Sequence, residues 1–395
     1  EIITASYYLG IPHPPGYPLY CLLGKLFSYL PLSNIAYRVN LTSAFFASIT
    51  ILFFFLLTRC IARKYLDEIK LHTELIILFT SITFALSFSF WNQSLIAKGG
   101  IYTLNLFIIT SILYIFWNIS EKNSIKLVPL VAVLCGMGIA NHSTMVPLSL
   151  IFFLYSAWLT YRIDKTKFIS QSLMFILTLS IVTIILYLYL PIRSLNNPPI
   201  DWGNTKNLDN IIRHITRKQF QTVEPWKRPL FHFTSQVGEY FKLVINQNNF
   251  LYLLAPLGIY ILFKIKKHFI MIILIIFILT SVGFATFTLL LNSYDKYTVD
   301  PFLIPSYFLL ALLGTVGLLY IFNILLRTKF RYLSIIISIV SILFVFYANY
   351  FKNDKSKNWV AYDYGINILK SVSNNGTLFV VCDNPAFITI YLNKV

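Results

Sequence analysis

The sequence predicts an all-α polytopic membrane protein, on the basis of its composition, its apolar runs and the placement of its basic residues. Of the 395 residues, 57% are hydrophobic and 12% are charged. A soluble domain carries about 45–50% apolar and roughly 25% charged residues. The composition therefore excludes a soluble globular protein, a disordered chain and a disulfide-stapled secreted domain.

Ten segments are apolar enough for membrane spans, and most reach the roughly 17–25 residues that crossing a bilayer requires. They are residues 41–58, 74–91, 101–118, 127–141, 144–160, 168–190, 250–264, 269–291, 303–326 and 332–350. Residues 19–30 are too short to span and predict an interfacial helix. We expect a bundle of about ten spans within residues 1–350, with long outer segments at 1–40 and 191–249.

Basic residues predict the orientation of these spans. The short loops at 59–70, 122–126, 162–167, 264–267 and 327–331 together hold fifteen Lys and Arg residues. The short loops on the other side hold only Lys98 and Lys296. Basic loops stay cytoplasmic, so the outer segments are predicted to face away from the cytoplasm.

Net charge and the C-terminal tail complete this prediction. The net charge is +17. In a membrane protein, basic residues determine the topology and bind anionic lipid headgroups. We therefore expect membrane lipid, and not nucleic acid, as a partner. Residues 351–395 are predicted to lie outside the membrane on the non-cytoplasmic side. The run at 375–383 (NGTLFVVCD) is typical of a strand, which indicates the start of a small soluble α/β tail.

Unusual sequence motifs gather on the predicted outer side, and the first follows the N-terminus. Segment 10–18 (GIPHPPGYP) is too rich in proline for a helix. His13 is either incidental in a rigid loop or a fixed imidazole that binds phosphate or assists proton transfer. Arg38, close to Asn40 at the start of the first span, is either a snorkelling residue or a phosphate ligand.

Two later motifs also allow two interpretations. Asn141 and His142 form either a capping turn between two spans or a lipid-phosphate site at the membrane surface. Arg193 follows a span directly and places a cation at headgroup depth. In the rigid run at 197–203, Trp202 either anchors at the interface or stacks on a sugar, and Asp201 is a turn residue or a site carboxylate.

Two further outer clusters carry charge. Arg217 belongs to a basic run that is either a solvated helix face near anionic lipid or a clamp for a phosphorylated lipid carrier. Asp295 and Tyr297 lie in a polar cluster between two spans, which is either an internally paired loop or part of a site. No DxD-type carboxylate pair or CxxC motif stands out, so the sequence predicts no metal site and leaves a divalent metal requirement open.

Together these motifs resemble the GT-C superfamily of membrane glycosyltransferases. More narrowly, they are similar to a group long catalogued as a domain of unknown function, to which a eukaryotic protein O-mannosyltransferase belongs. The motifs that carry the resemblance are EIITASYYLGIPHPPGYPLY (1–20), RVNLTSA (38–44), IYTLN (101–105), GMGIANHSTMVP (136–147), YLPIRSLNNPPIDWGN (189–204), IIRHITRKQF (211–220) and YTVDPFLIPSYFLLAL (297–312). They cover nearly the whole chain.

The resemblance implies a GT-C fold, a polyprenyl-phosphate-linked sugar as donor and a hydroxyl acceptor on the non-cytoplasmic side. The acceptor would be a protein Ser or Thr or a glycan, with mannose as one candidate sugar. We expect Glu1 and His13 to be catalytic. The expected phosphate ligands are Arg38, His142, Arg193 and Arg217, and the expected sugar or acceptor contacts are Asn40, Asn141, Asp201, Trp202, Asp295 and Tyr297. We expect a bacterial inner membrane, with the active side facing the periplasm; an endoplasmic reticulum member would have the same topology.

The chain also departs from the family pattern. The resemblance implies a preceding span and an Asp three residues before Glu1, and relatives continue beyond Val395 into a soluble tail. We therefore expect a member truncated at both ends. Relatives tend to carry Glu at the position of Gly100. These departures keep two alternatives open, an inactive fragment or lipid-binding pseudo-enzyme, and a lipid exporter that would tolerate loss of Glu1 and Asp201.

Overall fold

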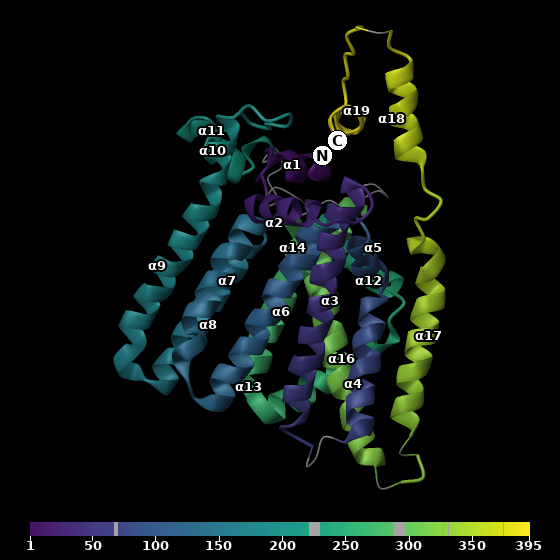
Figure 1. Cartoon of the computed structure of the whole chain (residues 1–395). Helices are drawn as coiled ribbons and strands as arrows, with labels where there is room; N and C mark the ends of the chain where they lie inside the picture. Colours follow the sequence, from purple (N-terminus) through teal and green to yellow (C-terminus); the bar gives the residue numbers. More distant parts are fainter. Residues whose placement is uncertain (67–69, 221–229, 288–296, 327, 331, 374) are drawn as a thin grey trace.

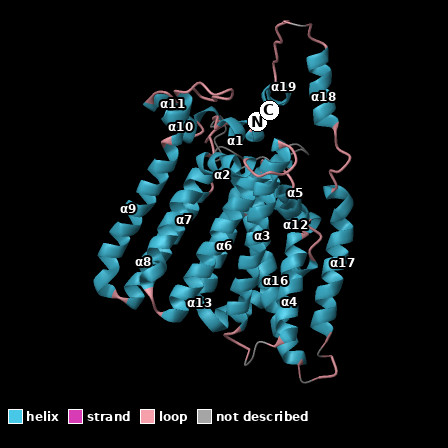
Figure 2. Ribbon diagram, in the orientation of Figure 1, coloured by secondary structure: helices cyan, strands magenta, loops and turns pink. Residues whose placement is uncertain are grey.

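The fold consists of helices that run side by side, capped at one end by a layer of short helices (Figure 1). The computed structural model describes the chain except residues 67–69, 221–229, 288–296, 327, 331 and 374. Figure 2 shows helices and loops throughout. In the described part of the chain, the only β-type pairing is an isolated bridge between Ile11 and Asp201.

Apolar helices of membrane-crossing length form the bundle. They include α3 (Ile35–Ala62), α6 (Gly99–Lys122), α8 (Met145–Ile163), α9 (Phe168–Tyr187), α13 (Ala255–Thr280), α16 (Ile304–Leu325) and α17 (Leu333–Asn353). Among the described residues, seven helical stretches can cross a membrane, or eight when a bent helix pair is included. The prediction of an all-α polytopic membrane protein is confirmed.

The count differs from the ten predicted spans for three local reasons. Segment 74–91 is divided between α4 (Leu71–Ala85) and α5 (Phe88–Ser94), which are bent by 72°. Segment 127–141 is the short helix α7 (Val128–Asn141), preceded by the 3-10 turn η1 (Ile125–Leu127). The predicted span at 250–264 and the described part of the one at 269–291 lie largely in one helical stretch, Phe250–Phe284, which is interrupted where Lys266 has non-helical φ and ψ angles.

The break between α4 and α5 is closed by asparagines of α17. The Asn349 side-chain nitrogen donates to the carbonyl of Leu86 at 3.0 Å, and that of Asn353 donates to the carbonyl of Phe88 at 3.4 Å. In lipid no water can satisfy such carbonyls, so a broken helix needs donors from its neighbours. Helix α17 is otherwise mostly lipid-facing, with 28% of its apolar window buried.

A buried polar network joins α5 to α16 near the same place. The Asp300 carboxylate, in the turn η6 (Asp300–Leu303), accepts hydrogen bonds from the hydroxyls of Ser89 and Tyr307. Gln247, which follows α12 (Leu230–Asn246), donates to the Ser89 hydroxyl at 2.8 Å. These contacts fix the start of α16 against the bent pair.

Glycines allow the closest helix packing in the bundle. Gly314 and Gly317 of α16 lie against carbonyls of the turn η5 (Phe250–Leu254), and Gly258 of α13 lies against that of Leu313. A Cβ atom on Gly314 would lie only 2.1 Å from the Leu251 carbonyl oxygen. Small residues are typical of such close interfaces in membranes, because association there depends on van der Waals packing.

Short helices cover one end of the bundle (Figure 1). They are α1 (Ile2–Tyr8), α2 (Pro18–Ser28), α10 (Tyr189–Ser194), α11 (Leu208–Ile215) and α14 (Val282–Phe287). The interfacial helix predicted at 19–30 is α2. This layer lies at the opposite end of the bundle from the basic connections at 122–126 and 162–167.

The C-terminal segment returns to this layer. After α18 (Val360–Lys370), helix α19 (Asp383–Lys394) contacts α1, and the Tyr8 hydroxyl donates to the Lys394 carbonyl at 2.5 Å. The strand predicted at 375–383 is wrong for the described residues of this segment, which form no strand. A strand needs a hydrogen-bonded neighbour, and no described segment pairs with residues 377–381, which are largely exposed.

We expect Gly314→Ala to destabilise the protein, because the added methyl group collides with a backbone carbonyl that cannot rotate away. The loss should be about 1–3 kcal/mol, visible as a lower unfolding temperature in detergent. Gly238→Ala is the matched control, because nothing lies within 4 Å of a Cβ there. Equal unfolding temperatures for both variants would contradict the close packing of η5 on α16.

Candidate functional site

Glu1, His13 and Tyr17 form a hydrogen-bonded group at the capped end of the bundle. One Glu1 carboxylate oxygen accepts from the backbone N–H of His13 at 2.6 Å, and the other contacts His13 Nδ1 at 2.6 Å. The Tyr17 hydroxyl contacts His13 Nε2 at 2.9 Å. With the proton assigned to Nδ1, the ring donates to Glu1 and accepts from Tyr17.

The protonation states in this group follow from burial and contact. Burial raises the pKa of the Glu1 carboxyl, but hydrogen bonds and electrostatic contact with His13 outweigh it and lower the pKa below its usual value. Burial raises the pKa of Tyr17 far above its usual range. Glu1 is therefore ionised and Tyr17 protonated at neutral pH. The side chains of Glu1 and His13 remain 14% and 18% exposed.

Two glycine turns and a buried histidine fix the loop that carries His13. Gly16 and Gly203 have φ angles of +91° and +86°, which favour glycine. The His214 ring lies between these turns: a Cβ on Gly16 would lie 3.1 Å from its Nε2, and one on Gly203 would lie 2.6 Å from its Nδ1. Burial, followed by the charge of His13, lowers the pKa of His214 to about 4, so this ring is neutral.

Backbone hydrogen bonds join this loop to the segment after α10. Ile11 donates to the Ile200 carbonyl at 2.7 Å and accepts from the Trp202 backbone N–H at 3.0 Å. Between them, Asp201 accepts from the Ser194 hydroxyl at 2.8 Å. Its other carboxylate oxygen is buried without a hydrogen-bond partner among the described residues. Asp201 thus lies beside the site, and one of its carboxylate oxygens holds the loop through Ser194.

Trp202 lies next to the Glu1–His13 pair. Its ring is 6.4 Å from that of His13, measured between centroids, and stacks on Phe387 of α19 at 5.8 Å. Its indole N–H donates to the Gln219 side chain at 3.4 Å. An aromatic ring at this place can bound a sugar or acceptor near His13.

His142 lies on the inner side of the same group. Its ring stacks on that of Tyr17 with centroids 6.0 Å apart. The Thr144 backbone N–H donates to Nδ1 at 3.3 Å, so the ring proton is assigned to Nε2. Nε2 is buried and meets no hydrogen-bond acceptor in the described part of the chain. The neighbouring Asn141 holds this turn by donating to the Ile101 carbonyl at 2.8 Å.

The surroundings of His142 keep it neutral. Burial, followed by the charges of Arg217, His13 and Lys98, lowers its pKa to about 3. A cavity of about 280 Å³ lies beside it, lined by Thr144, Phe302 and other largely apolar residues. The cavity is lined by the two residues that follow His142 and by Phe302, whose ring lies 5.1 Å from the His142 ring, measured between centroids.

Two cations face this group. Burial lowers the pKa of Lys98, Glu1 opposes this shift, and the charge of Arg217 adds to it. Lys98 therefore lies near both Glu1 and Arg217. Lys98 and Arg217 place basic side chains near this group, and basic side chains suit a phosphate group. Among the residues that the structure describes, no cluster of His, Cys, Asp and Glu has the arrangement of a metal site.

The structure gives Arg38 and Arg193 partners other than those expected. Arg38 donates to the carbonyls of Ser28, Leu32 and Ser33 in the α2–α3 connection. Arg193 donates to the carbonyls of Tyr8 and Leu9 at the end of α1. Both guanidinium groups cap helix ends or turns, where terminal carbonyls lack intrahelical partners. These contacts link both arginines to the scaffold.

The remaining predicted residues are only partly brought together. Asn141 supports the His142 turn, whereas Asn40 lies in the second turn of α3 with no side-chain hydrogen bond to a described residue. Tyr297 is 66% exposed. Asp295 lies outside the described residues.

Sequence reasoning missed Tyr17, Lys98 and His214 as parts of the site. Tyr17 lies four residues after His13, inside the proline-rich motif, and its spacing was a usable signal. The presence of glycine at position 100 has a steric explanation, because a Cβ atom there would lie 2.4 Å from the Tyr20 ring. A carboxylate at this position has no room in this chain.

The N-terminal part of the chain, residues 1–169, matches the family model described as the protein O-mannosyl-transferase TMEM260 N-terminal domain. In this part the chain is similar to the TMEM260 protein O-mannosyl-transferases. The matched region includes Glu1, His13, Tyr17, Lys98 and His142.

Two curated relatives extend this similarity. Protein O-mannosyl-transferase TMEM260 of Mus musculus is 28% identical over 229 residues, which cover 56% of this chain and 31% of that protein. Protein O-mannosyl-transferase tmem260 of Dictyostelium discoideum is 24% identical over 442 residues, which cover 100% of this chain and 52% of that protein. The chain spans about half the length of these relatives or less.

We expect stability to fall as the pH drops from 6.5 toward 3, and His142 to account for part of the loss. The unfolded histidine takes up its proton near its usual pKa of about 6.5, whereas the folded one does so only near 3. The unfolded state therefore binds more protons in this window, which costs about 2 kcal/mol at pH 5.

Unfolding temperatures of the wild type and His142→Gln between pH 7 and pH 5 check this expectation. His142→Gln should lose less stability on acidification. His72→Gln is the control and should behave as the wild type, because His72 lies at the other end of the bundle on α4. Parallel pH curves for wild type and His142→Gln would contradict a buried, neutral His142.

We expect Arg193→Ala to loosen α1, because two carbonyls at its end lose their charged donor. The free energy of unfolding should fall by about 1–3 kcal/mol, and backbone hydrogen exchange should become faster across residues 2–9. Lys206→Ala is the control, because Lys206 is exposed and bonds only to the Asn197 side chain in the described structure. Unchanged hydrogen exchange in Arg193→Ala would contradict a role of Arg193 in holding α1.

Proposed function

We propose that the chain carries the active site of a membrane glycosyltransferase. The donor is a polyprenyl-phosphate-linked sugar, and the acceptor is a protein Ser or Thr hydroxyl. The observation that carries this proposal is the hydrogen-bonded Glu1–His13–Tyr17 group, which lies beside Trp202 and His142 at the capped end of the bundle. The relatives' name suggests mannose as the sugar.

In this proposal Glu1 is the general base for the acceptor hydroxyl. Its carboxylate is ionised and held by two contacts with His13, so it can take the proton from the acceptor hydroxyl. The acceptor oxygen then bonds to the anomeric carbon while the bond to the donor phosphate breaks. The configuration at that carbon inverts, and the proton resides on Glu1 or is passed on to solvent.

The cations stabilise the leaving phosphate group. Lys98 and Arg217 stabilise the negative charge that develops on the phosphate oxygens. The Nε2–H of His142 adds a hydrogen-bond donor that is already held in place before the reaction. The apolar cavity beside His142 suits the first part of a polyprenyl chain. Arg193, Arg38 and Asp201 act by holding the loops, and Trp202 bounds the sugar.

We also propose that this site faces away from the cytoplasm, in a bacterial inner membrane with the site on the periplasmic side. Support comes from the fifteen Lys and Arg residues in the five short loops at the opposite end. No nucleotide is available outside the cytoplasm, so an activated sugar there has to be lipid-linked. The sidedness can be tested by cysteine labelling of either end in intact cells.

A lipid-binding pseudo-enzyme is the second candidate. The observation that favours it is Gly100, where relatives tend to carry a carboxylate and this chain has no room for one. Such a protein would bind the polyprenyl-phosphate sugar without transferring it. Donor binding and transfer therefore have to be measured separately.

We expect Arg217→Gln to reduce transfer of labelled mannose from polyprenyl phosphate to a Ser/Thr-rich peptide by about 100-fold, because one stabilising charge is lost. The matched control is Arg213→Gln, in the helix α11 that precedes Arg217, whose exposed side chain pairs with Asp209 at 2.7 Å. It should retain activity within about twofold, since exposed ion pairs contribute little.

Glu1→Gln completes this experiment. We expect transfer to fall by about 100-fold or more, while binding of the labelled donor to the purified chain stays within about threefold. Donor binding without transfer by the wild type would favour the pseudo-enzyme. Full activity of both Glu1→Gln and Arg217→Gln would contradict the proposed site.

A further inference from the structure

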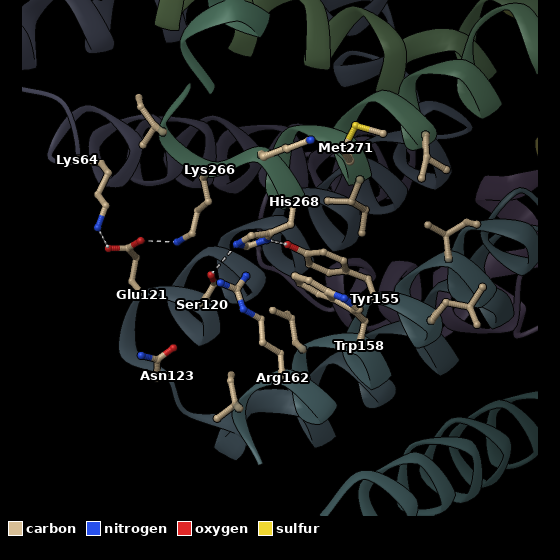
Figure 3. Close-up of a pocket in the computed structure, with 18 residues that line it drawn as sticks. Lys64, Ser120, Glu121, Asn123, Tyr155, Trp158, Arg162, Lys266, His268 and Met271 are labelled. Atoms are coloured by element: carbon tan, nitrogen blue, oxygen red, sulfur yellow. Dashed lines mark hydrogen bonds and ion pairs between the residues drawn. The ribbon is translucent and has the colours of Figure 1, made fainter. Parts of the chain in front are cut away.

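A second cavity lies at the opposite end of the bundle, among the predicted cytoplasmic loops. It has a volume of about 880 Å³ and lies between α6, α8 and α13 (Figure 3). Its lining combines charged residues at the helix ends with apolar residues of α8 and α13. It shares no residue with the Glu1–His13 group.

The charges of this cavity are unbalanced. Four lining residues are Lys or Arg, and one, Glu121, is acidic. Glu121 is already shared by Lys266, whose ammonium contacts it closely, and Lys64, which lies 3.3 Å away. For Arg162 and Lys267, no carboxylate partner occurs within the described residues. The Lys267 ammonium lies over the Phe263 ring at 5.2 Å, so Arg162 and Lys267 carry two charges that no described carboxylate balances.

The remaining polar groups are fixed in the wall. His268 Nδ1 contacts the Tyr155 hydroxyl at 2.7 Å, and its Nε2 contacts the Ser120 hydroxyl at 3.4 Å (Figure 3). The guanidinium of Arg162 lies over the Trp158 ring at 5.4 Å. Its N–H donors make no hydrogen bond to another described residue, so they are available to a ligand.

The apolar part of the cavity opens toward the lipid. Leu154, Met271 and Ile275 line it and are 53%, 46% and 41% exposed. Trp158 is 40% exposed at the same level as the basic residues, which is typical of the interface between headgroups and acyl chains. A ligand here would have an anionic group next to Arg162 and Lys267 and apolar chains along α8 and α13.

We propose that this cavity binds an anionic membrane phospholipid, with its phosphate at Arg162 and Lys267 and its acyl chains on the exposed apolar wall. Basic pockets between helices at the cytoplasmic side suit such headgroups. A soluble phosphate compound would use the cations but leave the apolar wall unoccupied. The lipid would join α8 to the kink of α13 at Lys266.

Lipid retention by the full chain tests the proposal. The chain is purified in detergent with equimolar phosphatidylglycerol and phosphatidylcholine, and retained lipid is counted by native mass spectrometry. We expect preferential retention of phosphatidylglycerol. The double variant Arg162→Gln/Lys267→Gln should weaken it by about tenfold or more, since each basic residue near the surface contributes about 1 kcal/mol.

Two further variants separate charge from shape. Arg63→Gln/Lys126→Gln removes the same charge at the same end of the bundle but outside the cavity lining, and should leave retention unchanged. Met271→Trp keeps the charges and fills the apolar wall, and should reduce retention. Unfolding temperatures show whether each variant is folded.

Three results would overturn the proposal. They are equal retention of both lipids by the wild type, equal loss in the two double variants, and displacement of phosphatidylglycerol by millimolar glycerol 3-phosphate. The last result would indicate a site for soluble phosphate compounds. None of these measurements depends on transferase activity, so they are independent of the proposed function.

Discussion

Backbone pairing of Ile11 with the segment after α10 is the interaction on which the capped end of the bundle depends. Two hydrogen bonds, to Ile200 and from Trp202, join parts of the chain that lie about 190 positions apart in the sequence. They bring Trp202 to His13 and close the two glycine turns around His214. The Glu1–His13 group is therefore built by two loops that fix each other, on a platform of membrane helices.

Much of the fold was predictable because lipid leaves the chain few choices. Within the described residues, every predicted span falls on helical segments, and α2 was expected as an interfacial helix. The details that failed depend on tertiary contacts. The bend between α4 and α5 needs donors from Asn349 and Asn353, and no local pattern reveals them. Likewise, the apolar run at 377–381 indicated a strand, but it has no partner among the described residues.

The site was predicted in outline, and the family resemblance is confirmed by the match of residues 1–169. The motifs at 10–18, 136–147 and 190–204 do meet at one end of the bundle. Individual roles were harder to predict, because Arg and His are used both for binding and for holding backbone. Arg193 and Arg38 contact carbonyls, whereas Lys98 joins the site through a turn that the sequence did not emphasise. The catalytic roles themselves stay predictions.

The asparagines that close the α4–α5 break have a consequence for biogenesis. Membrane proteins enter the bilayer from the N-terminus onward, and the carbonyls of Leu86 and Phe88 bond to donors more than 260 positions later. While the chain is being made, this early bend lacks those donors. Insertion of α17 therefore completes a helix pair made much earlier, so the N-terminal half reaches its final shape only after most of the chain has been synthesised.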